Sequence, residues 1–256
     1  MSLIDDFLAG GSLWLVGLGL FGFMLLAAQA GAISRKRLAR PARAGEDAEG
    51  YLLSATLALL GLLIAFTFSL AVSRFDARRQ LVVNEANAIG TAWLRAGLAG
   101  GPQDPQLQQA IAHYTDVRLG LSTGKDAATV ERETAREQGV VWQALGKTVA
   151  NAPSALVNST VMAVNEMFDA ASSRKAERAA KIPARVLEML VLYAIMSAGI
   201  VGYVMSASGR RHLVVTSILF LLLSLAITLI LDLDQPRQGS ILVSQQPMLD
   251  ARAAMP

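Results

Sequence analysis

The sequence predicts an all-α integral membrane protein with four transmembrane helices and a helical soluble section between the second and third spans. Hydrophobic residues make up 53% of the chain and charged residues 17%, whereas about a quarter of an ordinary soluble domain is charged. The apolar residues gather in four windows, each close to the ~20 residues that cross a bilayer as a helix. No alternating apolar–polar run of useful length indicates a strand.

The composition argues against enzymatic chemistry. The chain has no cysteine, which excludes disulfides, thiolate metal sites and cysteine nucleophiles. Its two histidines, His113 and His212, lie in unrelated contexts, so neither a histidine metal centre nor a catalytic triad is expected. The net charge of +3 is too small to indicate nucleic-acid binding. We therefore expect neither an enzyme nor a nucleic-acid-binding protein, and we expect no organic cofactor.

The first span is expected at residues 12–33 and the second at 51–73. The segment before the first span has two aspartates and no base, which is unlike a signal peptide. The helical pattern continues beyond Arg74, because apolar residues recur at spacings of three, four and seven. The second helix should therefore leave the membrane and end at Gly100-Gly101-Pro102. Its apolar stripe comprises Phe75, Val82, Ala86, Ile89, Trp93 and Ala96.

Three further helices are expected in the soluble section, at residues 106–121, 127–150 and 154–181. They would form an antiparallel layer on the extension of the second span. Asn84, Glu85 and Asn87 lie on the polar side of that extension. We expect them to face solvent, or to line a water-filled vestibule.

The third span is expected at residues 186–206 and the fourth at 213–231. Small residues recur every four positions along the third span, which allows a neighbouring backbone to approach closely. Asp232 and Asp234 follow the fourth span, where they could contribute to a calcium site or form a solvated helix end. The small residues are Ala194, Ala198, Gly202 and Ser206.

These elements divide the chain into four predicted parts. They are a first transmembrane hairpin at 1–75, the soluble section at 76–184, a second hairpin at 185–232 and a tail at 233–256. The positive-inside rule places both hairpin loops in the cytoplasm and the termini and soluble section outside. The loop bases are Arg35, Lys36, Arg37, Arg40, Arg43, Arg210 and Arg211.

Two stretches of the sequence resemble a bacterial membrane protein family called bestrophin-like. They are GLLIAFTFSLAVSRFDARRQLVVNEANAIGTAWLRAGL, from the second span onward, and LDLDQPRQGSILVSQQPMLD, after the fourth. The more specific motifs are Glu85-Ala86-Asn87 and residues 232–239. The resemblance implies a multi-pass protein of the cell (inner) membrane. The sequence also resembles, more distantly, the bestrophin anion channels. These channels likewise place a helical section between two pairs of spans.

The resemblance to those channels implies a pore along the second span. Their pore has three apolar residues four apart, followed by an arginine and an aromatic residue. Aligning Arg74-Phe75 with that ending places Ala58, Leu62 and Phe66 on the pore. Arg74, Arg78 and Arg79 would then surround one mouth and concentrate anions. The alternative for Phe66 is that it packs against Ala198 and Gly202 of the third span.

The function expected from the resemblance is an oligomeric ion channel that conducts anions. The alternative is a non-conducting membrane scaffold or sensor whose soluble helices bind a partner. Expected partners are membrane lipid, small inorganic ions and further copies of the chain, in a ring such as a pentamer. The acidic calcium clasp of animal bestrophins would correspond to Asp232 and Asp234. Bestrophins keep both termini in the cytoplasm, which is the opposite of the orientation that the charge rule favours.

Overall fold

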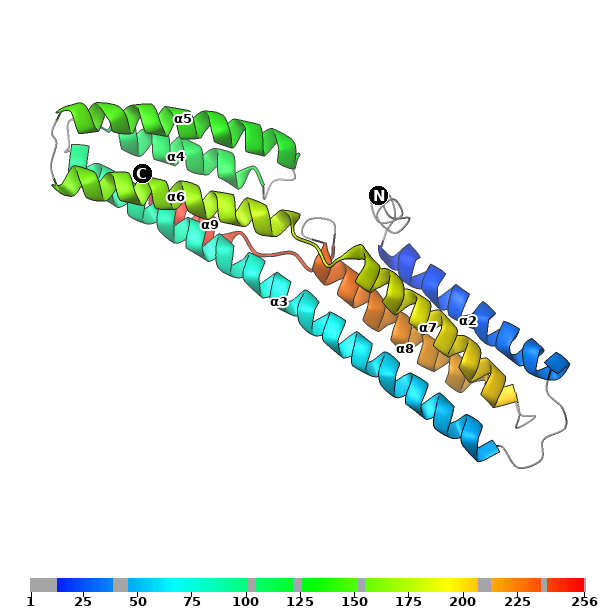
Figure 1. Ribbon diagram of the computed structural model, residues 1–256. Coiled ribbons are helices and arrows are strands. Elements are labelled where there is room, and N and C mark those ends of the chain that lie inside the picture. The colour runs from blue at the N-terminus through cyan, green and yellow to red at the C-terminus, as the bar shows by residue number, and fades with distance from the viewer. Residues whose placement is uncertain are drawn as a thin grey trace. The chain divides into compact units, whose positions relative to one another are not determined.

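A computed structural model describes residues 13–38, 46–100, 105–121, 126–151, 155–206, 213–235 and 239–255. Every regular element in these ranges is a helix (Figure 1). The chain divides into two compact units. The membrane unit comprises residues 1–75 and 181–242, and the soluble unit comprises residues 76–180 and 243–256.

The membrane unit contains α2 (Leu13–Leu38), the first part of α3 (Glu46–Gly100), α7 (Ala184–Met205) and α8 (Leu213–Asp234). Four helices of the described chain are long and apolar enough to cross a membrane, which confirms the predicted number of spans. Helix α2 extends past the predicted end at residue 33. The basic run Arg35–Arg37 forms its last turn. Helix α8 likewise extends past residue 231, to include both aspartates.

Helices α2 and α7 pack against each other through small residues. A Cβ added to Gly202 of α7 would overlap the backbone of Ala28 in α2, and one added to Gly31 of α2 would overlap the backbone at Gly199. Ala194 and Ala198 of the same stripe are 0% and 1% exposed. The backbones of α2 and α7 therefore approach closely, as small residues permit between membrane helices.

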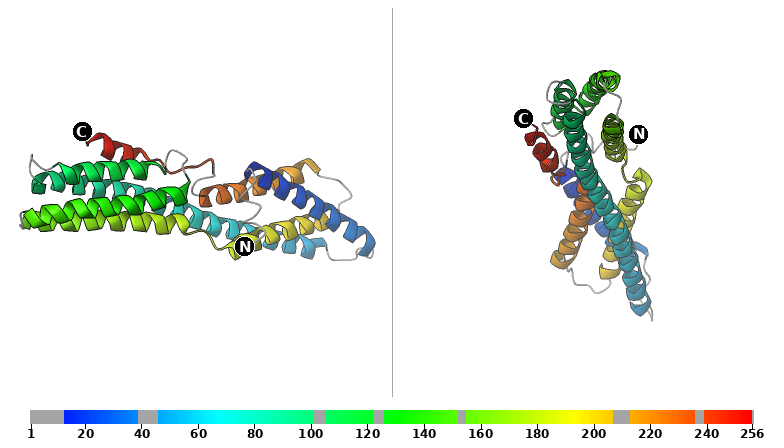
Figure 2. Two further views of the ribbon diagram at one scale, coloured as in Figure 1. Left: turned by 90° about the horizontal axis from the view of Figure 1, so that it is seen from above. Right: turned by 90° about the vertical axis from the view of Figure 1, so that its left-hand side faces the viewer.

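The soluble unit contains the rest of α3 with α4 (Gln106–Leu119), α5 (Ala127–Asn151), α6 (Ala155–Ala179) and α9 (Gln246–Ala253). Helices α4 to α6 confirm the three helices predicted for the soluble section. Helix α9 was not predicted from the sequence; it begins with Pro247 in its first turn, a position that suits proline. Figure 2, in which α9 is red, shows it beside α4.

The core of the soluble unit joins all of its helices with the C-terminal segment. Ile89, Ile111, Val141 and Met167, from α3 to α6, are each 0% exposed, and so is Met248 of α9. The predicted separate tail at residues 233–256 is therefore divided in the structure. Residues up to 242 belong to the membrane unit and the remainder to the soluble unit.

Candidate functional site

Helix α3 has two unlike faces within the membrane unit. Leu60, Thr67 and Ala71 are 0%, 6% and 0% exposed, and they share one side of the helix because they are spaced by seven and four residues. Leu62 and Phe66 are 50% and 65% exposed. At about 100° of rotation per residue, they lie on the opposite side, together with Ala58. The predicted pore residues thus occupy the face of α3 that turns away from the rest of the membrane unit.

The alternative position predicted for Phe66 is wrong. Its side chain is 65% exposed, so it does not fill the space beside the small stripe of α7. That space is taken by α2, whose Ala28 lies directly against Gly202. The polar side chain nearest in sequence, Thr67, donates hydrogen bonds to the carbonyls of Leu63 at 2.8 Å and Ile64 at 3.1 Å.

The three arginines predicted at the pore mouth have different environments. Arg78 is 5% exposed, Arg74 is partly buried and Arg79 is exposed. By helical rotation, Arg74 and Arg78 lie near the side of α3 that carries Leu60 and Ala71. Arg79 is thus the most exposed of the three, and the prediction that Arg74, Arg78 and Arg79 surround a pore mouth stays a prediction.

Glu85 is a buried carboxylate at the junction of three helices of the soluble unit. Its side chain is 0% exposed. Arg118 of α4 donates from Nε to Oε1 at 2.5 Å, and Arg174 of α6 donates from Nη1 to Oε2 at 2.6 Å. The expectation that Glu85 faces solvent or a vestibule is therefore wrong. Glu85 of the Glu85-Ala86-Asn87 motif therefore joins three helices of this unit.

A second carboxylate extends the network to α5 and to the C-terminal segment. Glu131 of α5 accepts a hydrogen bond from Arg178 of α6, lies 3.5 Å from Nη1 of Arg118 and 3.6 Å from Nζ of Lys175. Arg174 also donates to the side chain of Gln245, just before α9. One connected set of polar contacts therefore joins α3, α4, α5, α6 and the segment before α9.

Mutual attraction keeps the central ion pairs charged. Burial alone raises the pKa of Glu85, but the Arg118 and Arg174 guanidiniums outweigh it and hold that pKa below its usual value. For Arg118, burial lowers the pKa, yet the neighbouring Glu85 carboxylate raises it above the usual value overall. Buried charges of this kind are stable only as a matched set, because removing one partner leaves the other uncompensated.

Asp232 and Asp234 accept hydrogen bonds from the segments at which the chain enters and leaves the second half of the membrane unit. The Asp232 carboxylate accepts hydrogen bonds from the backbone N–H of Ser240 at 2.6 Å, its Oγ–H at 2.5 Å, and the N–H of Ile241 at 3.2 Å. A Cβ at Gly239 would lie 2.5 Å from Asp232 Oδ1, so the turn requires glycine. Asp234 accepts from the N–H of Ile182 at 3.0 Å. Within the described residues, no group of three or more acidic, histidine or cysteine side chains could hold a metal.

Both aspartates are 5% exposed, so the expectation of a solvated helix end is wrong. Their place in the motif at residues 232–239 follows from the turn that Asp232 stabilises. A calcium ion at this pair stays a prediction.

These features define a class of protein: a four-span, all-α membrane protein whose second span continues unbroken into a soluble helical unit. The Bestrophin-like domain family matches residues 21–248. The chain belongs to this Bestrophin-like family.

Solved structures share the fold at low sequence identity. A mutant of a bacterial bestrophin homolog from Klebsiella pneumoniae is 13% identical, with a TM-score of 0.68 over 95% of this chain and 99% of that one. Another structure of a Klebsiella pneumoniae bestrophin homolog is 12% identical, with a TM-score of 0.65 over 92% and 98%. A crystal structure described as a membrane protein gives 12% and 0.65 over 93% and 99%. No curated protein matches the sequence.

Proposed function

We propose that the chain forms a homo-oligomeric ion channel in the cell (inner) membrane, conducts anions, and lines its pore with the membrane part of α3. The observation that carries the proposal is the apolar face of Ala58, Leu62 and Phe66. It lies opposite the packed side of α3 and is exposed in the described part of the membrane unit. Membership of the Bestrophin-like family supports the same assignment.

An oligomer is needed because four membrane helices are too few to enclose a wide pore. Most soluble homo-oligomers close by point-group symmetry, and by the same rule a ring such as a pentamer would bring one α3 from each subunit to a common axis. Phe66 would then form an apolar constriction, which restricts conduction by excluding water. Arg79 would supply the exposed positive charge beyond the span, and Arg78 would remain within the protomer.

The decisive test replaces Phe66 in channels reconstituted into planar bilayers. Phe66→Ala should raise single-channel conductance, because removing the ring widens the constriction. Phe68→Ala is the matched control: it makes the same change two residues away, on a different side of α3, where the ring is 39% exposed. Equal effects of both substitutions would place the constriction elsewhere. Chloride and sodium gradients would measure the selectivity.

A non-conducting scaffold or sensor is the second candidate. It is favoured by large apolar side chains on the surface of the soluble unit: Leu94 and Leu98 of α3 are 62% and 67% exposed, and Met162 of α6 is 64% exposed. Such side chains suit a partner protein. A stable oligomer without measurable current, in the wild type and in Phe66→Ala alike, would favour this candidate over the channel.

A further inference from the structure

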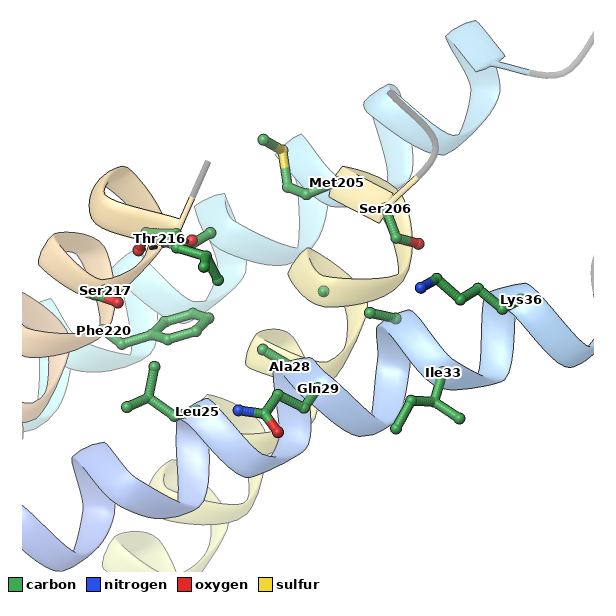
Figure 3. Close-up of a pocket in the computed structure, with 13 residues that line it drawn as sticks. Leu25, Ala28, Gln29, Ile33, Lys36, Met205, Ser206, Thr216, Ser217 and Phe220 are labelled. Atoms are coloured by element: carbon green, nitrogen blue, oxygen red, sulfur yellow. Dashed lines mark hydrogen bonds between the residues drawn. The ribbon is translucent and has the colours of Figure 1, made fainter. Parts of the chain in front are cut away.

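An open pocket of ≈ 460 Å³ lies in the membrane unit among α2, α7 and α8 (Figure 3). This volume is within the range of about 300–1,000 Å³ typical of small-molecule sites. Its lining is divided by chemistry. Leu25 and Ile33 present apolar surface, whereas Gln29, Lys36 and Ser217 present polar groups; Phe220, 1% exposed, lies behind the lining.

The pocket spans the boundary between the hydrocarbon layer and the polar interface. Lys36 lies in the last turn of α2, within the basic run Arg35–Arg37. Leu25 lies eleven residues earlier on the same helix, or about 16 Å deeper along its axis. The opposite walls come from the end of α7 and the start of α8, including Ser206 and Thr216. The polar end is therefore at the membrane surface that carries the two hairpin loops.

Lys36 is the basic side chain among the described residues that line this pocket, and its neighbour Arg35 forms contacts outside it. Arg35 forms an ion pair with Glu49, and its guanidinium lies over the ring of Tyr203, 5.0 Å from the centroid. Lys36 has no ion pair within the described part of the chain, and Figure 3 shows its amino group directed toward Ser206. Among the described lining residues, one cation with hydroxyl groups around it suits a phosphate ester.

We propose that this pocket binds an anionic phospholipid. The phosphate lies beside Lys36, and one acyl chain lies against Leu25 and Ile33. Charge complementarity favours this occupant, because basic residues at the ends of membrane helices attract anionic headgroups. A zwitterionic lipid such as phosphatidylcholine also has a phosphate, but its own trimethylammonium group balances that charge, so its net attraction to Lys36 is weaker. The site is independent of ion conduction, so it stands whether or not the chain is a channel.

The first experiment measures which lipids remain bound to the purified full-length protein, by native mass spectrometry after equilibration with vesicles of phosphatidylglycerol and phosphatidylcholine at equal amounts. The wild type should retain phosphatidylglycerol preferentially. Lys36→Gln should lower that preference about fivefold, the effect expected for one base at an anionic surface. Arg37→Gln is the matched control: it removes one charge from the adjacent residue, which does not line the pocket.

A second variant tests the apolar part of the site without changing charge. Ala32 lines the pocket, and Ala32→Leu should reduce the retention of both lipids by filling space that a chain would occupy. Circular dichroism and size-exclusion chromatography would establish that each variant keeps its fold and oligomeric state.

Three outcomes would overturn the proposal. Equal loss in Lys36→Gln and Arg37→Gln would indicate a diffuse basic surface. Unchanged lipid retention in Lys36→Gln and Ala32→Leu would indicate that another occupant, such as a second copy of the chain, covers the pocket. Binding of inorganic phosphate with the same dependence on Lys36, and without lipid, would assign the site to free phosphate.

Discussion

A single carboxylate, Glu85, shows why a site can escape prediction from sequence. In the sequence it is a polar residue on an amphipathic helix, and most such residues face water. Its partners Arg118 and Arg174 lie 33 and 89 residues away along the chain. Nothing in local spacing brings them to Glu85; the packing of α4 and α6 against α3 does so. The motif around Glu85 was recognisable, but its structural role depended on tertiary contacts.

Glu85→Gln should destabilise the soluble unit by about 3–5 kcal/mol, the usual cost of removing one partner from a buried ion pair. The amide cannot balance the charges of Arg118 and Arg174, which would remain buried. Thermal unfolding in detergent, followed by circular dichroism, would measure the effect. Glu166→Gln is the control, since Glu166 is an exposed position on α6 and its loss should leave the melting temperature nearly unchanged. Equal melting of both variants and wild type would contradict the ion-pair assignment.

The contribution of Glu85 should also depend on pH. Its pKa in the folded protein is below the usual value, so the unfolded state binds the proton more readily. The stabilisation is therefore complete above the ordinary carboxyl pKa and is lost as pH falls through the lowered value. The difference in melting temperature between wild type and Glu85→Gln should shrink on acidification. A difference that grew instead would contradict the direction of the pKa shift.

At the scale of helices, the spacing of small residues predicted which face of α7 packs against a neighbour, but not which helix that neighbour is. The four-residue repeat in α7 indicated that some neighbour approaches closely, and Ala194 and Ala198 are buried as such a stripe requires. The identity of the neighbour was not predictable, because α2 offers small residues at several positions. The structure selects Ala28 and Gly31, since these lie opposite the glycines of α7.

Gly202→Ala should destabilise the packing of α2 on α7 by about 1–3 kcal/mol, the range for overpacked sites. The added methyl group would meet the backbone of Ala28, which cannot rotate aside. Gly199→Ala is a close control on the same helix, because its Cβ would lie 3.6 Å from the nearest atom, the carbonyl oxygen of Ala27. Melting temperatures in detergent would compare the two. A larger loss in Gly199→Ala would contradict the packing described.

The helices of the soluble unit were largely predictable, because short-range sequence signals mark their ends and their apolar faces. Gly100-Gly101-Pro102 ends α3 in the sequence, and apolar periodicity marks α4 to α6. Helix α9 was missed because its eight residues are too few to show a period. This helix contributes one buried side chain, Met248, to the core of the soluble unit. A single apolar residue does not form a periodic pattern in the sequence.

At the scale of the whole chain, the two units are interleaved in sequence. The sequence predicted four consecutive parts, whereas the structure groups residues 1–75 with 181–242, and 76–180 with 243–256. The hydrophobic windows revealed the membrane unit directly. The return of the C-terminal segment to the soluble unit could not be read from hydropathy, because that segment is short and of mixed polarity.

The orientation in the membrane is a further prediction. The charges of the hairpin loops favour a cytoplasmic loop at residues 34–50, so a cysteine introduced there should be protected in intact cells. The chain has no native cysteine. In Ala44→Cys and Ser122→Cys, an impermeant thiol reagent would therefore label only the introduced residue. We expect labelling at position 122 and none at position 44. The reverse pattern would establish the orientation that the resemblance to bestrophins implies.

The burial of Met248 and Met255 in the core of the soluble unit has a consequence for biosynthesis. Domains generally fold as units while the ribosome adds about 5–20 residues each second. The helices up to residue 180 emerge first, but their core lacks these two methionines until α7 and α8 have been translated. We therefore expect the core of the soluble unit to become complete only after the last two membrane helices have been synthesised. A soluble unit with a complete core can therefore form only after α8 has been translated.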